Sequence, residues 1–379
     1  MNTALAVIFV FGLVIIIHEL GHFLVAKLAG ITVYEFSVGF GPRVFGFRYG
    51  ETRYNLRLLP LGGFVRAAGM DEEDDLREAR LRVAEERGLS PQQAEALPAE
   101  EVMASLDRNR FFRNRPLYQR ALMIVAGSLM NFVLAIVLFF IIFAVIGVPN
   151  YDAPPVIGEV KAGFPAEKVG MKPGDRLVAV DGKKVEKWDQ LLAVVRKKAG
   201  QPVRFTVLRD GRELQFIVTP VYDRQVRGGV VGITQRVPLE PLPVLKAARM
   251  ALASTGEIAV RITEVLRNFF RDKSHLQDIA GPVRMTVIIK DAAKMGLNYL
   301  LWLTAVISIN LGIFNLLPIP ALDGSRLLFL AAEAIRGKPV DPNKENMVHL
   351  VGFALLLLLM VVITYNDIIQ LLKAKGGPS

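Results

Sequence analysis

An apolar segment at residues 4–29 constrains this chain more than any other feature. About 20 apolar residues are enough for a helix to cross a bilayer, so this segment can span one. Within it lie His18, Glu19 and His22, in the order His-Glu-Leu-Gly-His. Ionisable side chains are costly in lipid, so three of them in one predicted span indicate a functional site.

The spacing of these residues predicts a zinc site. Residues four apart share one face of a helix, so His18 and His22 can bind the same ion. Glu19 is then placed as the catalytic general base for the attacking water. A chance match on a soluble helix is the alternative, but it leaves the apolar surroundings unexplained. We also expect a retained helix rather than a cleaved signal peptide, because no basic start precedes the segment and no small-residue cleavage site follows it.

The composition predicts a membrane protein. Hydrophobic residues make up 52% of the 379, and further apolar runs follow at 116–148, 283–317 and 345–368. The predicted fold class is therefore a polytopic α-helical membrane protein with about four transmembrane helices. The net charge of +10 fits basic residues flanking the spans, so we expect the lipid bilayer and no nucleic acid as partner. With no cysteine in the chain, zinc ligands must be His, Asp or Glu.

Two regions of different character follow the first span, which with its flanks covers residues 1–30. Residues 31–70 are rich in Val, Phe, Tyr and Gly, with a turn at 49–51, and predict a membrane-associated β-hairpin region. Its edge could hold an extended substrate, or it could be a plain connecting hairpin. Residues 71–115 form a polar, helical insertion that ends in arginines beside the second span, which places this side in the cytoplasm.

Two polar positions in the second span could serve the metal site. Gly127 and Asn131 lie one turn apart. Gly127 could allow close helix packing, and Asn131 could form a hydrogen bond toward the metal. A packing glycine and a purely structural asparagine are the alternative.

Residues 150–235 predict a separate α+β module, because short alternating strands, Asp-Gly turns and one helical stretch follow a Pro-Pro pair. The module resembles a PDZ domain. Its sequence could equally suit peptide binding or steric gating. The residues that carry the resemblance are Ala166, Gly170, Met171, Gly174, Asp175 and Leu177.

After the module, residues 241–282 predict amphipathic helices, and residues 283–336 hold the third span followed by a Pro-rich turn that ends at Asp323. Irregular backbone at membrane depth is tolerated only inside protein or beside water. Two histidines need a third protein ligand, and Asp323 fits that place. His275 and His349 are rival ligands, and an N-cap role is the alternative for Asp323.

These motifs together resemble the bacterial site-2 protease family, in its single-PDZ form with four spans. The resemblance implies that His18, His22 and Asp323 bind Zn²⁺, that Glu19 is catalytic and that Asn315 binds substrate. Gly127-Ser128 departs from the Gly-Pro that is common in the family. The matching segments are His18–His22, 39–42, 61–65, 131–132, the PDZ-like module and Asn315–Gly324.

The resemblance further implies an intramembrane zinc metalloendopeptidase. Its substrates would be pre-trimmed single-span membrane proteins, such as anti-sigma factors and signal-peptide remnants. We expect a multi-pass protein of the inner membrane, with the PDZ-like module and both termini outside and the active site toward the cytoplasm. A catalytically inactive, membrane-anchored PDZ adaptor with a vestigial metal site is one alternative. A transporter with a broken helix is another, but the spans show no internal repeat.

Overall fold

The computed structural model describes residues 2–271 and 281–375. The chain divides into two compact units. The larger unit combines Met1–Ile142 with Leu245–Ser379, and the smaller is Phe143–Val244. The two units are described separately below.

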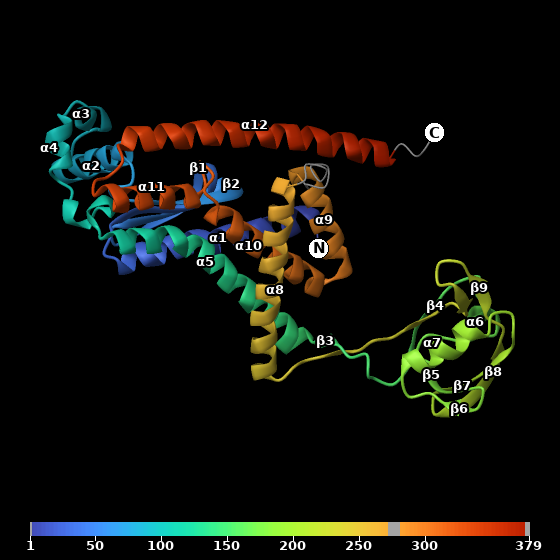
Figure 1. Cartoon of the computed structure of the whole chain (residues 1–379). Coiled ribbons are helices and arrows are strands. Elements are labelled where there is room, and N and C mark those ends of the chain that lie inside the picture. Colours follow the sequence, from blue (N-terminus) through green and yellow to red (C-terminus); the bar gives the residue numbers. More distant parts are fainter. Residues whose placement is uncertain (1, 272–280, 376–379) are drawn as a thin grey trace. The chain divides into compact units, whose positions relative to one another are not determined.

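Four helices in the described residues are long and apolar enough to cross a membrane, as predicted (Figure 1). Helix α5 contacts both α1 and α10, and α1 also contacts α10. These three helices therefore form the helical core around which the other elements of the larger unit are placed. The four helices are α1 (Thr3–Leu28), α5 (Leu117–Ile141), α10 (Leu297–Leu316) and α12 (Pro342–Lys375).

A glycine lets α1 approach α5 closely. A Cβ atom on Gly21 would lie 2.3 Å from the backbone oxygen of Ala126, so any larger residue would push the two helices apart. Small residues at helix contacts allow such close packing in membranes. The glycine of the His-Glu-Leu-Gly-His sequence is thus explained by packing.

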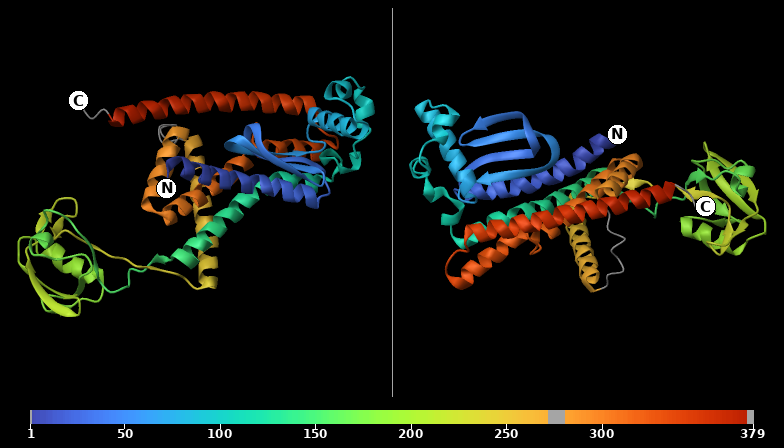
Figure 2. Two further views of the ribbon diagram at one scale, coloured as in Figure 1. Left: turned by 180° about the vertical axis from the view of Figure 1, so that it is seen from behind. Right: turned by 90° about the horizontal axis from the view of Figure 1, so that it is seen from above.

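The β-rich region is a hairpin of two long strands, β1 (Val33–Tyr49) and β2 (Thr52–Ala67), which packs against α1 (Figure 2). The hairpin folds back on itself, because residues 35–38 pair with 53–56 on one side, while residues 33–38 pair with 63–67 on the other. Residues 33–38 are therefore central, and residues 63–67 form one free edge. Among the described residues no other strand pairs with that edge.

The polar insertion has a small core of its own. Helices α2 and α4 pack their apolar faces around Ala79, Val83 and Val102, all buried. The buried carboxylate of Asp75 accepts hydrogen bonds from the Gly69 N–H and the Tyr34 hydroxyl, which ties the insertion to the hairpin. Its elements are α2 (Glu72–Arg87), α3 (Pro91–Glu95), α4 (Ala99–Met103) and the short turns Arg108–Arg110 and Phe112–Asn114.

A long amphipathic helix and two shorter helices complete the larger unit. These are α8 (Val244–Arg271), α9 (Pro282–Met295) and α11 (Asp323–Arg336). Proline takes the first position of α9, where its missing N–H costs nothing. The buried carboxylate of Asp367, from α12, accepts the backbone N–H groups of Gly281 and Arg284 at the start of α9. An acidic residue in the fourth span therefore serves as a cap for a neighbouring helix.

The smaller unit is an α+β domain, as predicted. Its four-stranded sheet has the order β6-β5-β7-β8, and its core includes Ala166, Met171 and Leu177 of the PDZ-like motif. Asp175 of the same motif is buried. Its carboxylate forms an ion pair with Arg209 and accepts a hydrogen bond from the Lys172 N–H. The helices are α6 (Pro165–Lys168) and α7 (Trp188–Lys197), after the π-helical turn Ile142–Ile146. The strands are β3 (Val148–Pro149), β4 (Ile157–Val160), β5 (Arg176–Val180), β6 (Lys183–Lys184), β7 (Val203–Arg209), β8 (Arg212–Val218), β9 (Val221–Asp223), β10 (Gly228–Val230), β11 (Ile233–Gln235) and β12 (Leu239–Glu240).

Candidate metal centre

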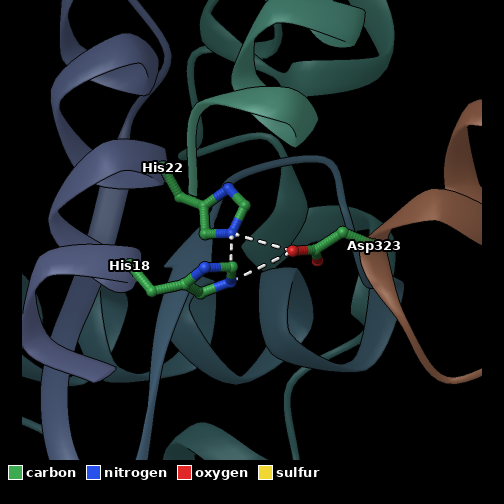
Figure 3. A group of neighbouring side chains, drawn as sticks. All are labelled: His18, His22 and Asp323. Carbon is green, nitrogen blue, oxygen red and sulfur yellow. Dashed lines mark hydrogen bonds and ion pairs between the residues drawn. The ribbon is translucent and has the colours of Figure 1, made fainter. Parts of the chain in front are cut away.

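Three candidate ligands meet in the larger unit, although they come from opposite ends of the chain (Figure 3). His18 and His22 project from one face of α1, and Asp323 is the first residue of α11. Oδ2 of Asp323 lies 3.1 Å from Nε2 of His18 and 3.2 Å from Nε2 of His22. The two imidazole nitrogens are 3.2 Å apart.

This triangle has the size of one face of a zinc tetrahedron. With bonds of about 2.0–2.1 Å to zinc, tetrahedral ligand atoms are separated by about 3.3 Å. All three separations in the structure are close to that value. Two imidazoles and one carboxylate leave a fourth position for water or substrate, which is the pattern of a catalytic rather than a structural zinc site.

The hydrogen bonds of His22 prepare its ring for a metal. The second ring nitrogen, Nδ1, lies 2.8 Å from the backbone oxygen of Met123 on α5. A carbonyl oxygen can only accept, so Nδ1 carries the proton and Nε2 presents its lone pair. Such second bonds fix the tautomer and the orientation of metal-binding histidines.

Asn131 supports His18 in the same way. Its side-chain amide nitrogen lies 3.1 Å from Nδ1 of His18, and its buried Oδ1 has no hydrogen-bond partner among the described residues. Exchanging the amide oxygen and nitrogen lets Oδ1 accept the Nδ1–H of His18 and resolves the unpaired atom. The His18 tautomer that binds metal through Nε2 requires this orientation. The hydrogen bond predicted for Asn131 is thus present.

Gly127 brings α5 against the ligand rings. A Cβ atom at this position would lie 2.3 Å from Nε2 of His22 and 2.8 Å from Cε1 of His18. Both values are far below any real contact, so only glycine fits while the rings hold their place. The close packing predicted for Gly127 is confirmed, and it serves the metal ligands directly.

The Pro-rich turn sets the position of Asp323. Ala321 adopts a left-handed backbone with φ 74°, which is uncommon for a residue with a side chain. Its N–H donates to Nδ1 of His349 at 3.2 Å. A Cβ atom on Gly324 would lie 2.2 Å from the oxygen of Leu317, so glycine is needed for α11 to begin beside the end of α10.

The alternatives to Asp323 fare differently. His349 bonds the turn before Asp323, and it does not belong to the group of convergent ligand atoms. His275 lies outside the described residues. The N-cap of α11 is Leu322, and the Asp323 carboxylate faces the imidazoles instead of capping the helix.

Glu19 faces a cavity of about 230 Å³, named here the metal cavity. The three candidate ligands also line it, and so do Gly63 and its neighbours on the free edge of β2. A Cβ atom on Gly63 would lie 3.0 Å from Cγ of Glu19, so the edge passes directly over this side chain. An extended peptide added to this edge would be brought to the metal position.

Asn315 lies at the end of α10 beside the same centre. Its side-chain amide is 3.2 Å from Nε2 of His18. The amide can therefore reach a group bound at the fourth metal position. The residues predicted from the sequence, His18, Glu19, His22, Asn315 and Asp323, all lie together at one site.

One neighbouring residue was not found from the sequence. Arg326 lines the metal cavity from α11, one turn after Asp323. That spacing was visible in the sequence, because residues three apart share a helix face. The sequence did not show that a cavity lies beside this face of the helix.

Comparisons with known proteins agree with this chemistry. The sequence matches peptidase family M50 over residues 6–359. It is 39% identical to "Zinc metalloprotease RasP" of Geobacillus kaustophilus, over 97% of this chain and 98% of that protein. It is 34% identical to "Regulator of sigma-W protease RasP" of Bacillus subtilis, over 98% and 99% of the two chains.

Among solved structures, the PDZ domain of an SdrC-like protein from Listeria monocytogenes covers 23% of this chain and 90% of its own. The identity is 25% and the TM-score 0.20, too low for that structure to assign a fold. The match over residues 6–359 takes in the metal centre and all but the ends of the chain, so this protein belongs to peptidase family M50.

Proposed function

We propose that the centre of His18, His22 and Asp323 is that of an intramembrane zinc metalloendopeptidase, with Glu19 as its catalytic base. The observation that carries the proposal is the convergence of the three ligand atoms on a cavity that Glu19 also lines. When bound, zinc would act as a Lewis acid toward the scissile carbonyl and lower the pKa of water. The relatives named as zinc metalloproteases support the same metal and reaction.

Glu19 would move the protons of the reaction. Its carboxylate accepts a proton from water as the water oxygen attacks the carbonyl carbon of the peptide. It then returns that proton to the amide nitrogen as the carbon–nitrogen bond breaks. The immediate products are a carboxylic acid and an amine, and Glu19 ends in its starting state. The acid then gives its proton to the amine, which leaves a carboxylate and an ammonium group.

A transmembrane substrate must also unwind, because the backbone of a helix is bonded to itself. The free edge at residues 63–67 offers backbone groups that can pair with an extended segment. The Asn315 amide, 3.2 Å from Nε2 of His18, would hold the same segment near the metal. This assigns the hairpin the role of substrate support rather than that of a plain connection.

We propose single-span membrane proteins, already trimmed outside the membrane, as substrates. Anti-sigma factors and signal-peptide remnants belong to this class. The Bacillus subtilis relative is named a regulator of sigma-W protease, which supports the first of these for this chain. The PDZ-like domain would exclude substrates that still carry a large domain outside the membrane.

The proposed orientation of the protein in the membrane rests on basic residues near the spans. Arg108, Arg110 and Arg113 precede the second span, and such clusters favour the cytoplasmic side. The active site would then open toward the cytoplasm of the inner membrane, and the smaller unit would lie outside.

The test uses the full-length protein in lipid vesicles with a single-span substrate in two forms, trimmed and carrying a folded outer domain. We expect wild type to cleave the trimmed form and Glu19→Gln to cleave neither, while both proteins retain zinc. Glu86→Gln, an exposed carboxylate of α2, is the matched control and should cleave as wild type does. Equal cleavage of both substrate forms would overturn the gating role alone.

An inactive PDZ adaptor would give a different result in this cleavage experiment. Zinc would be retained by wild type and Glu19→Gln alike, with no cleavage of any of several single-span substrates. Two observations argue against it: the full set of catalytic residue types is present, and the ligand geometry leaves a position open.

A further inference from the structure

Arg326 stands out among the basic residues near the metal centre. Among the described residues, it is the only arginine or lysine lining the metal cavity. It lies one turn after Asp323 on α11, so its side chain projects from the same face of that helix. The structure therefore places a guanidinium group beside the proposed site of peptide hydrolysis.

No described carboxylate forms an ion pair with this guanidinium. Within residues 2–271 and 281–375, its one recorded polar contact is Nη1 to the sulfur of Met70, at 3.8 Å. The three arginines that line a cavity together with Arg326 are each paired with a carboxylate: Arg66 with Asp74, Arg113 with Glu72 and Arg120 with Glu333. A guanidinium carries five N–H donors, so Arg326 has donors free for a ligand.

Arg326 also connects the metal cavity to a second one. A cavity of about 300 Å³, named here the adjoining cavity, is lined by Arg326, by Met70 and by edge residues Phe64 to Ala67. The metal cavity is lined by Gly63, Phe64 and Val65 of the same edge. The free edge of β2 thus runs along both cavities, and Arg326 belongs to the walls of both.

An extended peptide on this edge would leave half of its backbone unpaired. The edge can bond the N–H and C=O groups on one side of the peptide, but those on the other side would face the cavities. A buried carbonyl group without a hydrogen-bond donor is costly, so a donor there favours binding. Arg326 supplies such donors, and its planar group can serve two oxygens at once.

We propose that Arg326 is a substrate-binding residue that donates hydrogen bonds to backbone carbonyl oxygens of the extended substrate, on the side away from the β2 edge. This inference rests on the proposed protease function. Because carbonyl groups are common to all peptides, Arg326 would serve substrates of different sequence.

Binding to the inactive Glu19→Gln protein tests this proposal without turnover. The probe is a fluorescent single-span peptide in detergent, titrated with Glu19→Gln and with Glu19→Gln/Arg326→Met. We expect the second protein to bind about tenfold more weakly, with unchanged zinc content and unfolding temperature. Arg326→Lys should recover part of the loss. Arg336→Met, at the exposed end of the same helix, is the matched control and should bind as the parent does.

A product peptide separates carbonyl from carboxylate recognition. The fragment ending at the cleavage site is made with a free carboxylate and with an amide at that end. The proposal predicts that Arg326→Met weakens both forms to the same extent. Weakening of the carboxylate form alone would overturn it in favour of product binding.

Failure of this inference differs from failure of the proposed function. If wild type does not cleave the probe, the protease proposal fails and the inference falls with it. If wild type cleaves and Arg326→Met binds and cleaves equally well, only the inference is wrong. Loss of zinc or of thermal stability in Arg326→Met would assign the residue a structural role instead.

Discussion

At Gly127, the structure leaves no room for a single carbon atom. A Cβ would lie 2.3 Å from Nε2 of His22, the atom assigned to the metal. The helix backbone and the ring cannot both keep their places if the residue becomes larger. The demand for glycine here therefore comes from the metal ligands and not from a turn.

Gly127→Ala should therefore lose metal. We expect zinc affinity to fall by about 10–100-fold, the range seen when groups supporting metal ligands are altered, and cleavage to fall with it. The measurement is zinc retained after dialysis against a graded chelator series. Gly12→Ala is the matched control, because a Cβ at that position of α1 meets no atom within 4 Å. Unchanged zinc affinity in Gly127→Ala would refute the packing role.

At the scale of elements, a buried charge network holds the hairpin sheet together. Glu35, on the central segment of β1, is only 4% exposed. Its carboxylate accepts hydrogen bonds from Asn55 and Arg57 of the neighbouring strand and from Ser37. Burial by itself raises the pKa of Glu35, but these hydrogen bonds outweigh it and hold the pKa at about 2.

The lowered pKa of Glu35 predicts that the stability of the folded protein depends on pH. A carboxyl group whose pKa is lower in the folded state stabilises that state above its ordinary pKa of 4.5. The contribution is lost as the pH falls from 4.5 toward 2. We expect the unfolding temperature of wild type in detergent to drop over this window more steeply than that of Glu35→Gln.

At neutral pH the same variant should be less stable by about 1–3 kcal/mol, because charged hydrogen-bond partners are left unpaired. Glu86→Gln, whose exposed pair with Arg82 is solvent-screened, should differ from wild type by less than about 1 kcal/mol. Parallel pH profiles for wild type and Glu35→Gln would contradict the network.

At the scale of the whole molecule, a metal would join the two ends of the chain. His18 and Asp323 are 305 positions apart in sequence, yet their side chains are 3.1 Å apart. A bound ion would therefore stabilise the contact of α1 with α11. Ligands that bind only the folded state stabilise it by about 4 kcal/mol at a thousand times their dissociation constant.

Chelation should accordingly lower the unfolding temperature of the intact protein. We expect the chelator to lower the unfolding temperature of Glu19→Gln, which keeps all three ligands, as much as that of wild type. His18→Ala lacks one ligand, so the chelator should not lower its unfolding temperature. Differential scanning fluorimetry with and without chelator measures the shift. A chelator effect of equal size in His18→Ala would show that the stabilising ion binds elsewhere.

The sequence by itself determined the features that depend on local periodicity. The spacing of His18 and His22 put two imidazoles on one helix face, and the apolar runs defined four candidate spans. The motif around Asp175 likewise predicted a separate α+β domain. These features follow from helix and strand geometry over a few residues, so no knowledge of the fold was needed.

Only the tertiary structure decided which distant groups meet. From the sequence, both Asp323 and His349 were candidate metal ligands. In the structure, the strained turn at Ala321 places the Asp323 carboxylate at the metal site, and the N–H of Ala321 donates a hydrogen bond to His349 instead. The roles of Gly127 and Arg326 depend on helices and a strand edge packed together from distant parts of the chain. Such contacts are set by the packing of whole elements, and no local pattern in the sequence encodes them.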